Sequence, residues 1–360
     1  MNFFSELSME RKMKIKSILN HPYFGFFIIT FLMFFVQILS FLGVNVPISV
    51  MRAFGLTMIY IIIALGFSIL LGYAGLASLG TAGFVGVGTY ILGYLSNTLH
   101  YGFISILVIA ILIAILIGVI VGFISLRIEG MYLAIITLGL SEILNEIFKN
   151  ATVYTNGTNG LGINTLYFFS HPIPLNDSTV FVFLSVMLFV MMVLTLNIIK
   201  SPTGRAMLAM RNSESAAQAM GVSVFKYRLL AFMISTVYAV LGGYIYMSYF
   251  AFSIPTSWSL SFSLNILAAV IVGGSQSIYG ILLGTFMIFG LNLSVLQQIS
   301  FFQNNPAISI VFNGVLIIVV IMFYPGGLVR LIQTLYYKLK KALHQLHEKW
   351  RLYKYGPDPE

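Results

Sequence analysis

The sequence predicts an all-α polytopic membrane protein of about ten transmembrane helices, with both termini in the cytoplasm. Hydrophobic residues make up 59% of its 360 residues, whereas Asp, Glu, Lys and Arg together make up 8%. A soluble domain carries about 25% charged residues, so this chain has too few to cover a water-exposed surface. Apolar runs of about 20 residues, the length that crosses the hydrocarbon core as a helix, recur along almost the whole chain.

Ten apolar segments are long enough, or nearly long enough, to be these helices. They are 24–42, 49–71, 79–95, 103–126, 131–148, 179–199, 229–251, 259–273, 277–296 and 307–324. The first is longer than the apolar run of a signal peptide and no cleavage site of small residues follows it, so we expect it to be retained. The glycine-rich segment 79–95 and the short, serine-rich segment 259–273 are also compatible with broken or re-entrant helices.

The positive charges set the orientation of the predicted helices, because cytoplasmic loops are enriched in Lys and Arg. With the N-terminus inside and ten crossings, only Arg52 and Lys149 of the 19 Lys and Arg residues lie outside. An odd number of crossings would put the basic C-terminal region outside, so the number is even; eight remains open if neither weak segment crosses. The expected organisation is a cytoplasmic tail 1–23, a transmembrane domain 24–329 with a cytoplasmic loop 200–228, and a basic cytoplasmic tail 330–360.

The composition also excludes several kinds of functional site. The absence of cysteine excludes disulfides and thiolate chemistry, and the five scattered histidines predict no metal site. The net charge is +9, and the basic residues flank apolar segments. This placement favours a role in orienting the protein in the membrane over nucleic-acid binding. The chain has no Gly-x-x-x-x-Gly-Lys-Ser/Thr phosphate loop and no other catalytic cluster, so we expect a non-catalytic protein with no cofactor of its own.

The cytoplasmic loop 200–228 contains a short segment with strong helix signals. Ser213 is a good N-cap, and Gly221 is a natural C-terminal stop. The residues between them include good helix formers: Glu214, Ala216, Ala217, Gln218 and Ala219. Such a helix has small side chains, around which a groove of another protein can close. An ordinary amphipathic connector is the alternative.

Two carboxylates lie inside an apolar segment. Glu142 and Glu146 are four residues apart and so share one helix face, and we expect Asn145 to lie beside them. A charge at membrane depth is costly and normally faces the bundle interior or water. The pair is expected either to line a substrate path or to hold helices together, and Glu146 to reach the outer interface beside Lys149. Adjacent carboxylates repel unless one is protonated, which leaves proton coupling open.

Glycines are concentrated before and within the segment 79–95. They allow helices to approach closely, or allow the backbone to unwind where it lines a cavity. Ser78 and Thr81 add hydroxyl groups in this region. Helix packing and a translocation path are therefore both compatible with this pattern.

Six motifs occur in a fixed order along the chain. They are Gly75–Phe84 followed by Gly86, Gly88 and Tyr90; Gly130–Gly139 leading into Glu142 and Ile143; Thr155–Leu161; Glu214–Gly221; Gly273–Gly274 with Gly280 and Gly284; and Pro325–Leu328. In this order they resemble the permeases of ABC transporters, and within that class the LivM-type permeases of branched-chain amino-acid importers, over roughly 50–329. The Glu214–Gly221 segment resembles the EAA loop, the helix that docks into the ATPase subunit. This segment departs from the EAA pattern, since Ser215, Ala216 and Ala217 occupy the EAA positions. In two of the other motifs, Asn156 and Gln276 replace glycines of the family pattern.

The resemblance implies the ABC importer permease fold, with broken helices, in a bacterial cell membrane. It implies a complex of this chain with a second, LivH-type permease, two ATPase subunits that bind ATP, and an extracytoplasmic substrate-binding protein. The residues expected to couple to the ATPase are Arg211, Glu214, Ala216, Ala217 and Gly221. The candidates for the translocation path are Ser78, Thr81, Glu142 and Asn145.

The implied function is ATP-driven import of a small polar solute by alternating access, preferably a branched-chain amino acid. Relatives with this fold import nucleosides, urea or sugars, and these cargoes stay open. An ATP-independent secondary transporter or channel would predict inverted repeats and buried ion-binding carboxylates, and a membrane enzyme would predict a clustered His/Asp/Glu site. The sequence has no convincing internal repeat and only one carboxylate pair, so the importer subunit is the preferred interpretation.

Overall fold

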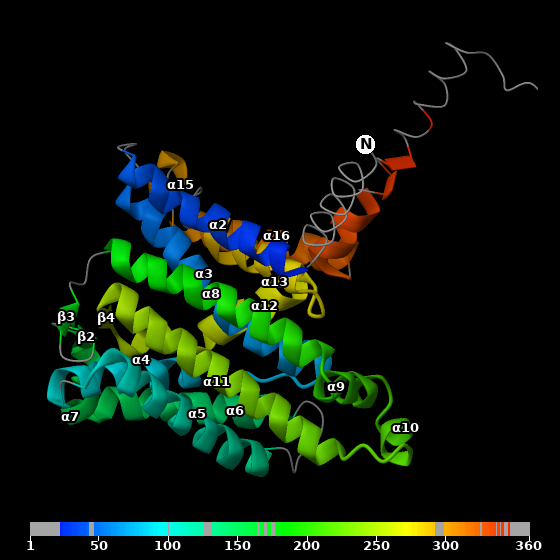
Figure 1. Ribbon diagram of the computed structural model, residues 1–360, viewed down its shortest axis with the longest axis horizontal. Helices are drawn as coiled ribbons and strands as arrows, with labels where there is room; N and C mark the ends of the chain where they lie inside the picture. The colour runs from blue at the N-terminus through cyan, green and yellow to red at the C-terminus, as the bar shows by residue number, and fades with distance from the viewer. Residues whose placement is uncertain are drawn as a thin grey trace, which may run out of the picture.

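A computed structural model describes residues 22–42, 47–99, 101–125, 132–163, 166–168, 171–173, 177–291, 299–304, 306–324, 326–335, 337–338, 340–341 and 345. Long helices, packed side by side in alternating directions, form nearly all of this part of the chain (Figure 1). The all-α fold class is therefore confirmed. The N-terminal tail up to residue 21 and most of the C-terminal tail lie outside the described residues.

Each of the ten predicted ranges contains a helix. The helices are α2 (Pro22–Phe41), α3 (Ile48–Ser68), α4 (Thr81–Leu99), α5 (Phe103–Ser125), α6 (Tyr132–Asn150), α8 (Asp177–Lys200), α11 (Val224–Phe250), α12 (Leu260–Gly273), α13 (Ile278–Thr285) and α16 (Pro306–Phe323). Within the described residues, five helices have the length and apolar composition to cross a membrane, with candidate spans that start at Pro22, Ile48, Phe103, Val180 and Val224. α12 and α13 are apolar but shorter.

Two of these helices end in wide, π-helical turns. Ile69–Tyr73 continues α3, and Phe286–Gly290 continues α13. After the first π-helical turn the chain is non-helical over 74–80, and α4 then runs unbroken for 19 residues from Thr81. The break expected near 79–95 therefore lies before the helix and not within it. The segment at 259–273 is the short helix α12, of 14 residues.

The remaining elements lie at the two ends of the bundle. One end carries α9 (Pro202–Asn212) and α10 (Glu214–Ala219). The opposite end carries α7 (Thr152–Thr155), α15 (Ser300–Asn304) and two small antiparallel pairs of strands (Figure 1). The strands are β1 (Leu161–Gly162) with β4 (Phe252–Ser253), and β2 (Leu166–Phe168) with β3 (His171–Ile173).

The antiparallel packing agrees with an alternating path through the bundle. The hydroxyl of Tyr23, in the first turn of α2, donates a hydrogen bond to Oδ1 of Asn197, in the last turn of α8, at 2.6 Å. The start of α2 therefore lies at the same end of the bundle as α9 and α10. Ten alternating crossings require this arrangement.

The centre of the bundle is formed by α3, α4 and α11, whose backbones approach closely. A Cβ atom on Gly88 of α4 would overlap the carbonyl group of Val240, and one on Gly243 of α11 would overlap that of Val85. Small residues permit such contacts between membrane helices, which associate mainly through close packing. For Gly88, the helix-packing interpretation of the glycine-rich segment is therefore the correct one.

Candidate functional site

The loop after α8 folds into α9 and α10, and local hydrogen bonds set the ends of these helices. Oγ of Ser213 accepts a hydrogen bond from the first turn of α10, as an N-cap does. At the other end, the N–H of Val222 donates to the carbonyl of Ala217 at 3.0 Å, which closes a Schellman motif around Gly221. Gly221 has φ = 82°, a conformation that costs glycine little. The short helix expected from Ser213 to Gly221 is confirmed.

The surface of α10 is exposed, and several of its residues are small. Ala216 is exposed, whereas Ala217 is buried against the body of the protein. Met220, directly after the helix, is 85% exposed. Among the described residues, no atom lies within 4 Å of the position that a Cβ on Gly221 would take. This surface, made of Ala216, Gln218, Ala219, Met220 and Gly221, is called the α10 surface below.

Glu214 binds within the chain. Its Oε2 lies 2.6 Å from Nη2 of Arg228, in the second turn of α11. The ion pair is partly exposed, with 38% of the Glu214 side chain and 20% of the Arg228 side chain accessible. Glu214 therefore attaches the start of α10 to α11.

Arg211 also turns toward the body of the protein. Its Nη1 donates a hydrogen bond to the backbone carbonyl of Gly72, in the π-helical turn that ends α3. Carbonyls in the last turn of a helix have no donor within the helix, and they attract a cation because the helix dipole is negative at this end. Arg211 supplies both a donor and a positive charge. This contact links α9 to the end of α3.

The same carbonyl is bound by the turn between α12 and α13. Nε2 of Gln276 donates to the carbonyl of Gly72 at 3.2 Å, and the hydroxyl of Tyr73 donates to the carbonyl of Gln276 at 2.8 Å. A Cβ on Gly72 would overlap the carbonyl of Ser275, so the turn lies directly against this glycine. Three parts of the chain thus meet at Gly72: α9, the end of α3 and the α12–α13 turn.

The N-terminus of α4 lies among hydroxyl groups from two other helices. The N–H of Gly83 donates to Oγ of Ser141 on α6 at 3.0 Å, and that of Ala82 donates to Oγ of Ser263 on α12 at 2.9 Å. Thr137 of α6 accepts a further hydrogen bond from the segment before α4. These side chains satisfy N–H groups that the start of a helix leaves without partners.

Two path candidates, Ser78 and Thr81, lie at this junction, and both are buried. Oγ of Ser78 accepts a hydrogen bond from the N–H of Gly80 at 3.2 Å. Three further hydroxyl residues meet at this junction that were not among the residues predicted from the sequence: Thr137, Ser141 and Ser263. The first two could have been found with Asn145, because 137, 141 and 145 repeat every four residues along one helix face.

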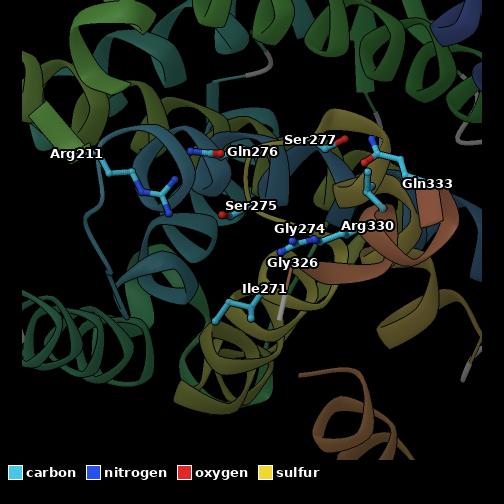
Figure 2. Close-up of a pocket in the computed structure, with 10 residues that line it drawn as sticks. Arg211, Ile271, Gly274, Ser275, Gln276, Ser277, Gly326, Arg330 and Gln333 are labelled. Atoms are coloured by element: carbon cyan, nitrogen blue, oxygen red, sulfur yellow. The ribbon is translucent and has the colours of Figure 1, made fainter. Parts of the chain in front are cut away.

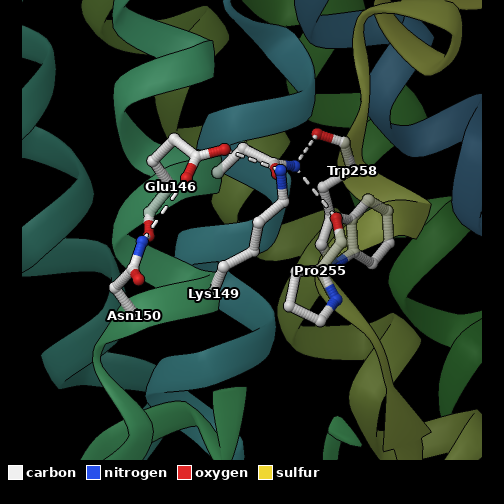
Figure 3. Close-up of polar contacts among 6 residues, drawn as sticks. Glu146, Lys149, Asn150, Pro255 and Trp258 are labelled. Atoms are coloured by element: carbon white, nitrogen blue, oxygen red, sulfur yellow. Dashed lines mark hydrogen bonds and ion pairs between the residues drawn. The ribbon is translucent and has the colours of Figure 1, made fainter. Parts of the chain in front are cut away.

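Asn145 and the two carboxylates lie on different faces of α6, which corrects the expectation that they would be grouped. Asn145 is 4% exposed, and its Nδ2 donates to the carbonyls of Pro255 (2.9 Å) and Trp258 (3.0 Å) (Figure 3). It therefore binds the turn before α12. Glu142 and Glu146 are exposed on the outer surface of α6.

Glu146 forms an ion pair one turn from the end of α6. Its Oε1 lies 2.7 Å from Nζ of Lys149, and its Oε2 faces the side-chain amide of Asn150 (Figure 3). The pairing with Lys149 agrees with the interface interpretation of Glu146. Glu142 is one turn further from that end, with Ile143 exposed beside it. Of the four path candidates, three are therefore buried inside the bundle, and Glu142 lies on its outside.

Comparison with known sequences identifies the fold that carries this geometry. The family described as branched-chain amino acid transport system / permease component matches residues 49–321, which is more than half of the chain. The chain belongs to this permease family. Residues 49–321 include α9 and α10, the Gly72 junction and the whole of α6. The permease is thus a multi-pass membrane protein, and its family is one of non-catalytic transport subunits.

Two relatives are similar in sequence to this permease over part of its length. It is 32% identical to the high-affinity branched-chain amino acid transport system permease protein LivM of Escherichia coli, over 65% of this chain and 60% of that protein. It is 29% identical to the ribose import permease protein RbsC of Bacillus subtilis, over 49% of this chain and 55% of that protein. The matched region thus spans less than two thirds of the length of either relative. No solved structure matches the chain significantly.

Proposed function

We propose that this permease is one membrane subunit of an ATP-driven importer in a bacterial cell membrane, and that its cargo is a branched-chain amino acid. The observation that carries the proposal is the α10 surface, a set of exposed, mostly small residues on a helix whose start is attached to the body of the protein. Glu214 attaches its start to α11, and Arg211 attaches the preceding helix to α3. A partner that moves α10 would therefore move the bundle. The likeness to LivM supports the choice of cargo.

The proposal assigns the energy source and the choice of solute to other chains. Two ATPase subunits would bind ATP and contact α10, and an extracytoplasmic binding protein would deliver the solute to the end that carries α7 and the strands. A second, LivH-type permease would complete the membrane part. Closure of the ATPase pair would then move α9 and α10 and switch the solute path between outward-facing and inward-facing states.

The outer face of α6 supports a second membrane subunit. Glu142 is exposed there with no ion pair in the described part of the chain, next to Ile143. A carboxylate facing hydrocarbon is costly, so such groups normally face protein or a water-filled cavity. We infer that the second permease covers this face and that Glu142 lies at the boundary between the two subunits, beside the solute path.

Uptake into proteoliposomes tests the proposal. The permease is reconstituted with its genomic neighbours, namely the second permease, the ATPases and the binding protein, and accumulation of tritiated leucine is followed with ATP on the ATPase side. The proposal expects uptake only with the complete set and ATP. Uptake by the permease without ATPase subunits would support a secondary transporter or channel and would refute the importer.

A sugar is the second candidate cargo, because the chain also resembles two ribose import permeases. The same vesicles separate the two cargoes by competition. Unlabelled leucine, isoleucine and valine are expected to suppress the uptake of labelled leucine, whereas ribose is expected to have no effect. Accumulation of labelled ribose in place of leucine would reverse the choice.

A further inference from the structure

A polar hollow of about 480 Å³ lies beside the Gly72 junction, at the end of the bundle that carries α9 and α10. Its walls come from α9, the turn between α12 and α13, and the helical residues 327–335. The polar side chains that line it are Arg211, Ser275, Gln276, Ser277, Arg330 and Gln333. Figure 2 shows that Arg211 and Arg330 extend into the hollow from opposite sides.

The charge of this hollow is positive. The described residues that line it include two guanidinium groups and no acidic residue. The ion pairs in the described part of the chain are Glu146–Lys149 and Glu214–Arg228, so neither Arg211 nor Arg330 has an acidic partner there. Arg211 uses one donor on Gly72, and a guanidinium has five. The hollow can therefore offer several N–H donors, two amides and two hydroxyls to an anion.

The shape of the anion follows from the donors. Guanidinium groups bind phosphate oxygens with two parallel hydrogen bonds, and they keep their charge at every physiological pH. Two such groups on opposite walls suit a phosphate ester, which presents oxygens in several directions. The amide of Gln333 and the hydroxyl of Ser277, which also line the hollow, suit the polar part of a larger headgroup.

The position of the hollow indicates where such a phosphate comes from. It lies where α12 ends and α13 begins, and Ile271 on the last turn of α12 both lines the hollow and is 39% exposed. Val329 adds a second apolar side chain. Basic pockets between membrane helices on the cytoplasmic side bind anionic lipid headgroups. The positive charges of the chain assign this end to the cytoplasm.

We propose that this hollow binds the phosphate of an anionic phospholipid, with Arg330 as its main ligand and Ile271 against the start of an acyl chain. The bound lipid would join residues 327–335 to the α12–α13 turn and to α9, beside the junction at Gly72. The lipid site does not depend on which solute is transported, so a test of lipid binding is separate from a test of the proposed cargo.

Native mass spectrometry of the full chain in detergent tests the site. Phosphatidylglycerol and phosphatidylcholine with identical acyl chains are titrated against the wild type and against Arg330→Gln, Arg330→Lys and Gln333→Ala. The wild type is expected to hold one phosphatidylglycerol more tightly than phosphatidylcholine. Arg330→Gln is expected to weaken it by about fivefold, the effect of one basic residue on an anionic lipid. Arg330→Lys keeps the charge, so we expect it to weaken phosphatidylglycerol binding less than Arg330→Gln does.

Lys338→Gln is the matched control, because it removes one exposed cation from the same C-terminal region outside the hollow. It is expected to bind phosphatidylglycerol like the wild type. Equal binding of both lipids, or an equal loss in Lys338→Gln and Arg330→Gln, would overturn the proposal. The proposal would also be overturned if inorganic phosphate displaced the lipid from the wild type and stayed bound. That result would assign the hollow to a soluble phosphate. Loss of a co-purifying ATPase from Arg330→Gln with unchanged lipid binding would assign it to a protein contact.

Discussion

The guanidinium of Arg211 binds the backbone carbonyl of Gly72, a residue 139 positions away in the sequence. Gln276 binds the same carbonyl from the turn between α12 and α13. The helix that precedes the α10 surface is therefore in direct contact with the central helix α3. This contact gives a physical route by which a force applied to α10 reaches the membrane-embedded helices.

Replacing Arg211 with Gln is expected to uncouple ATP hydrolysis from transport. A hydrogen bond that involves a charged group contributes about 1.5–3 kcal/mol, so its loss weakens the link between α9 and α3 by an order of magnitude or more. Leucine uptake into proteoliposomes should fall, while ATP hydrolysis and co-purification of the ATPase persist. Arg205→Gln is the control, because Arg205 lies on the same helix and its guanidinium donates to the nearby carbonyl of Lys200 and not to α3 in the described part of the chain. Equal uptake by both variants would contradict the coupling role.

Breaking the ion pair between Glu214 and Arg228 is expected to loosen α10 without unfolding the protein. The pair is partly exposed, so its contribution to global stability is about 0–1 kcal/mol. Glu214→Gln should increase hydrogen–deuterium exchange at residues 216–221 and leave α11 unchanged. The charge-swapped pair Glu214→Arg with Arg228→Glu should restore slow exchange. Unchanged exchange in the single variant would mean that Ser213 and Gly221 alone fix the helix.

Asn145→Ala is expected to destabilise the end of the bundle opposite α10. The change removes two hydrogen bonds and leaves the carbonyls of Pro255 and Trp258 without this donor. Leaving a buried polar group unsatisfied costs about 1–3 kcal/mol. The thermal midpoint measured by fluorescence in detergent should fall. Asn145→Asp tests the donor role, since a carboxylate accepts but cannot donate; a midpoint equal to that of the wild type would refute the assignment.

Gly88→Ala is expected to disturb packing between α4 and α11, because the added Cβ would overlap the backbone of Val240. Overpacking costs about 1–3 kcal/mol when the neighbour cannot move aside. Gly139→Ala, on α6, is the matched control: no atom of the described part of the chain lies within 4 Å of its Cβ position, and alanine favours a helix. The thermal midpoint should fall for the first variant and hold or rise for the second. The opposite order would show that the close approach at Gly88 is not tight.

Much of the architecture follows from the sequence, because hydrophobic length and positive charge act locally. Each of the ten apolar segments contains a helix, and Ser213 and Gly221 mark α10 because caps depend on neighbouring residues. The contacts of Arg211 and Gln276 with Gly72 join residues about 140 and 200 positions apart, so no local signal reveals them. The outward position of Glu142 and the inward one of Asn145 depend on which face of α6 meets the bundle. Because α6 has polar residues on both faces, its sequence alone does not show which face packs against the bundle.

The proposed function depends on docking of α10 against an ATPase, and cross-linking detects this contact. The chain has no cysteine, so single cysteines can be introduced without altering others. Met220→Cys places a thiol on the α10 surface, and Thr158→Cys places an exposed one near α7, at the opposite end of the bundle. With a thiol-to-amine cross-linker and the assembled complex, the cysteine at 220 is expected to capture the ATPase and the cysteine at 158 is not. Capture of the ATPase by the cysteine at 158 would contradict docking at α10. So would capture by neither cysteine in a complex that hydrolyses ATP and transports the solute.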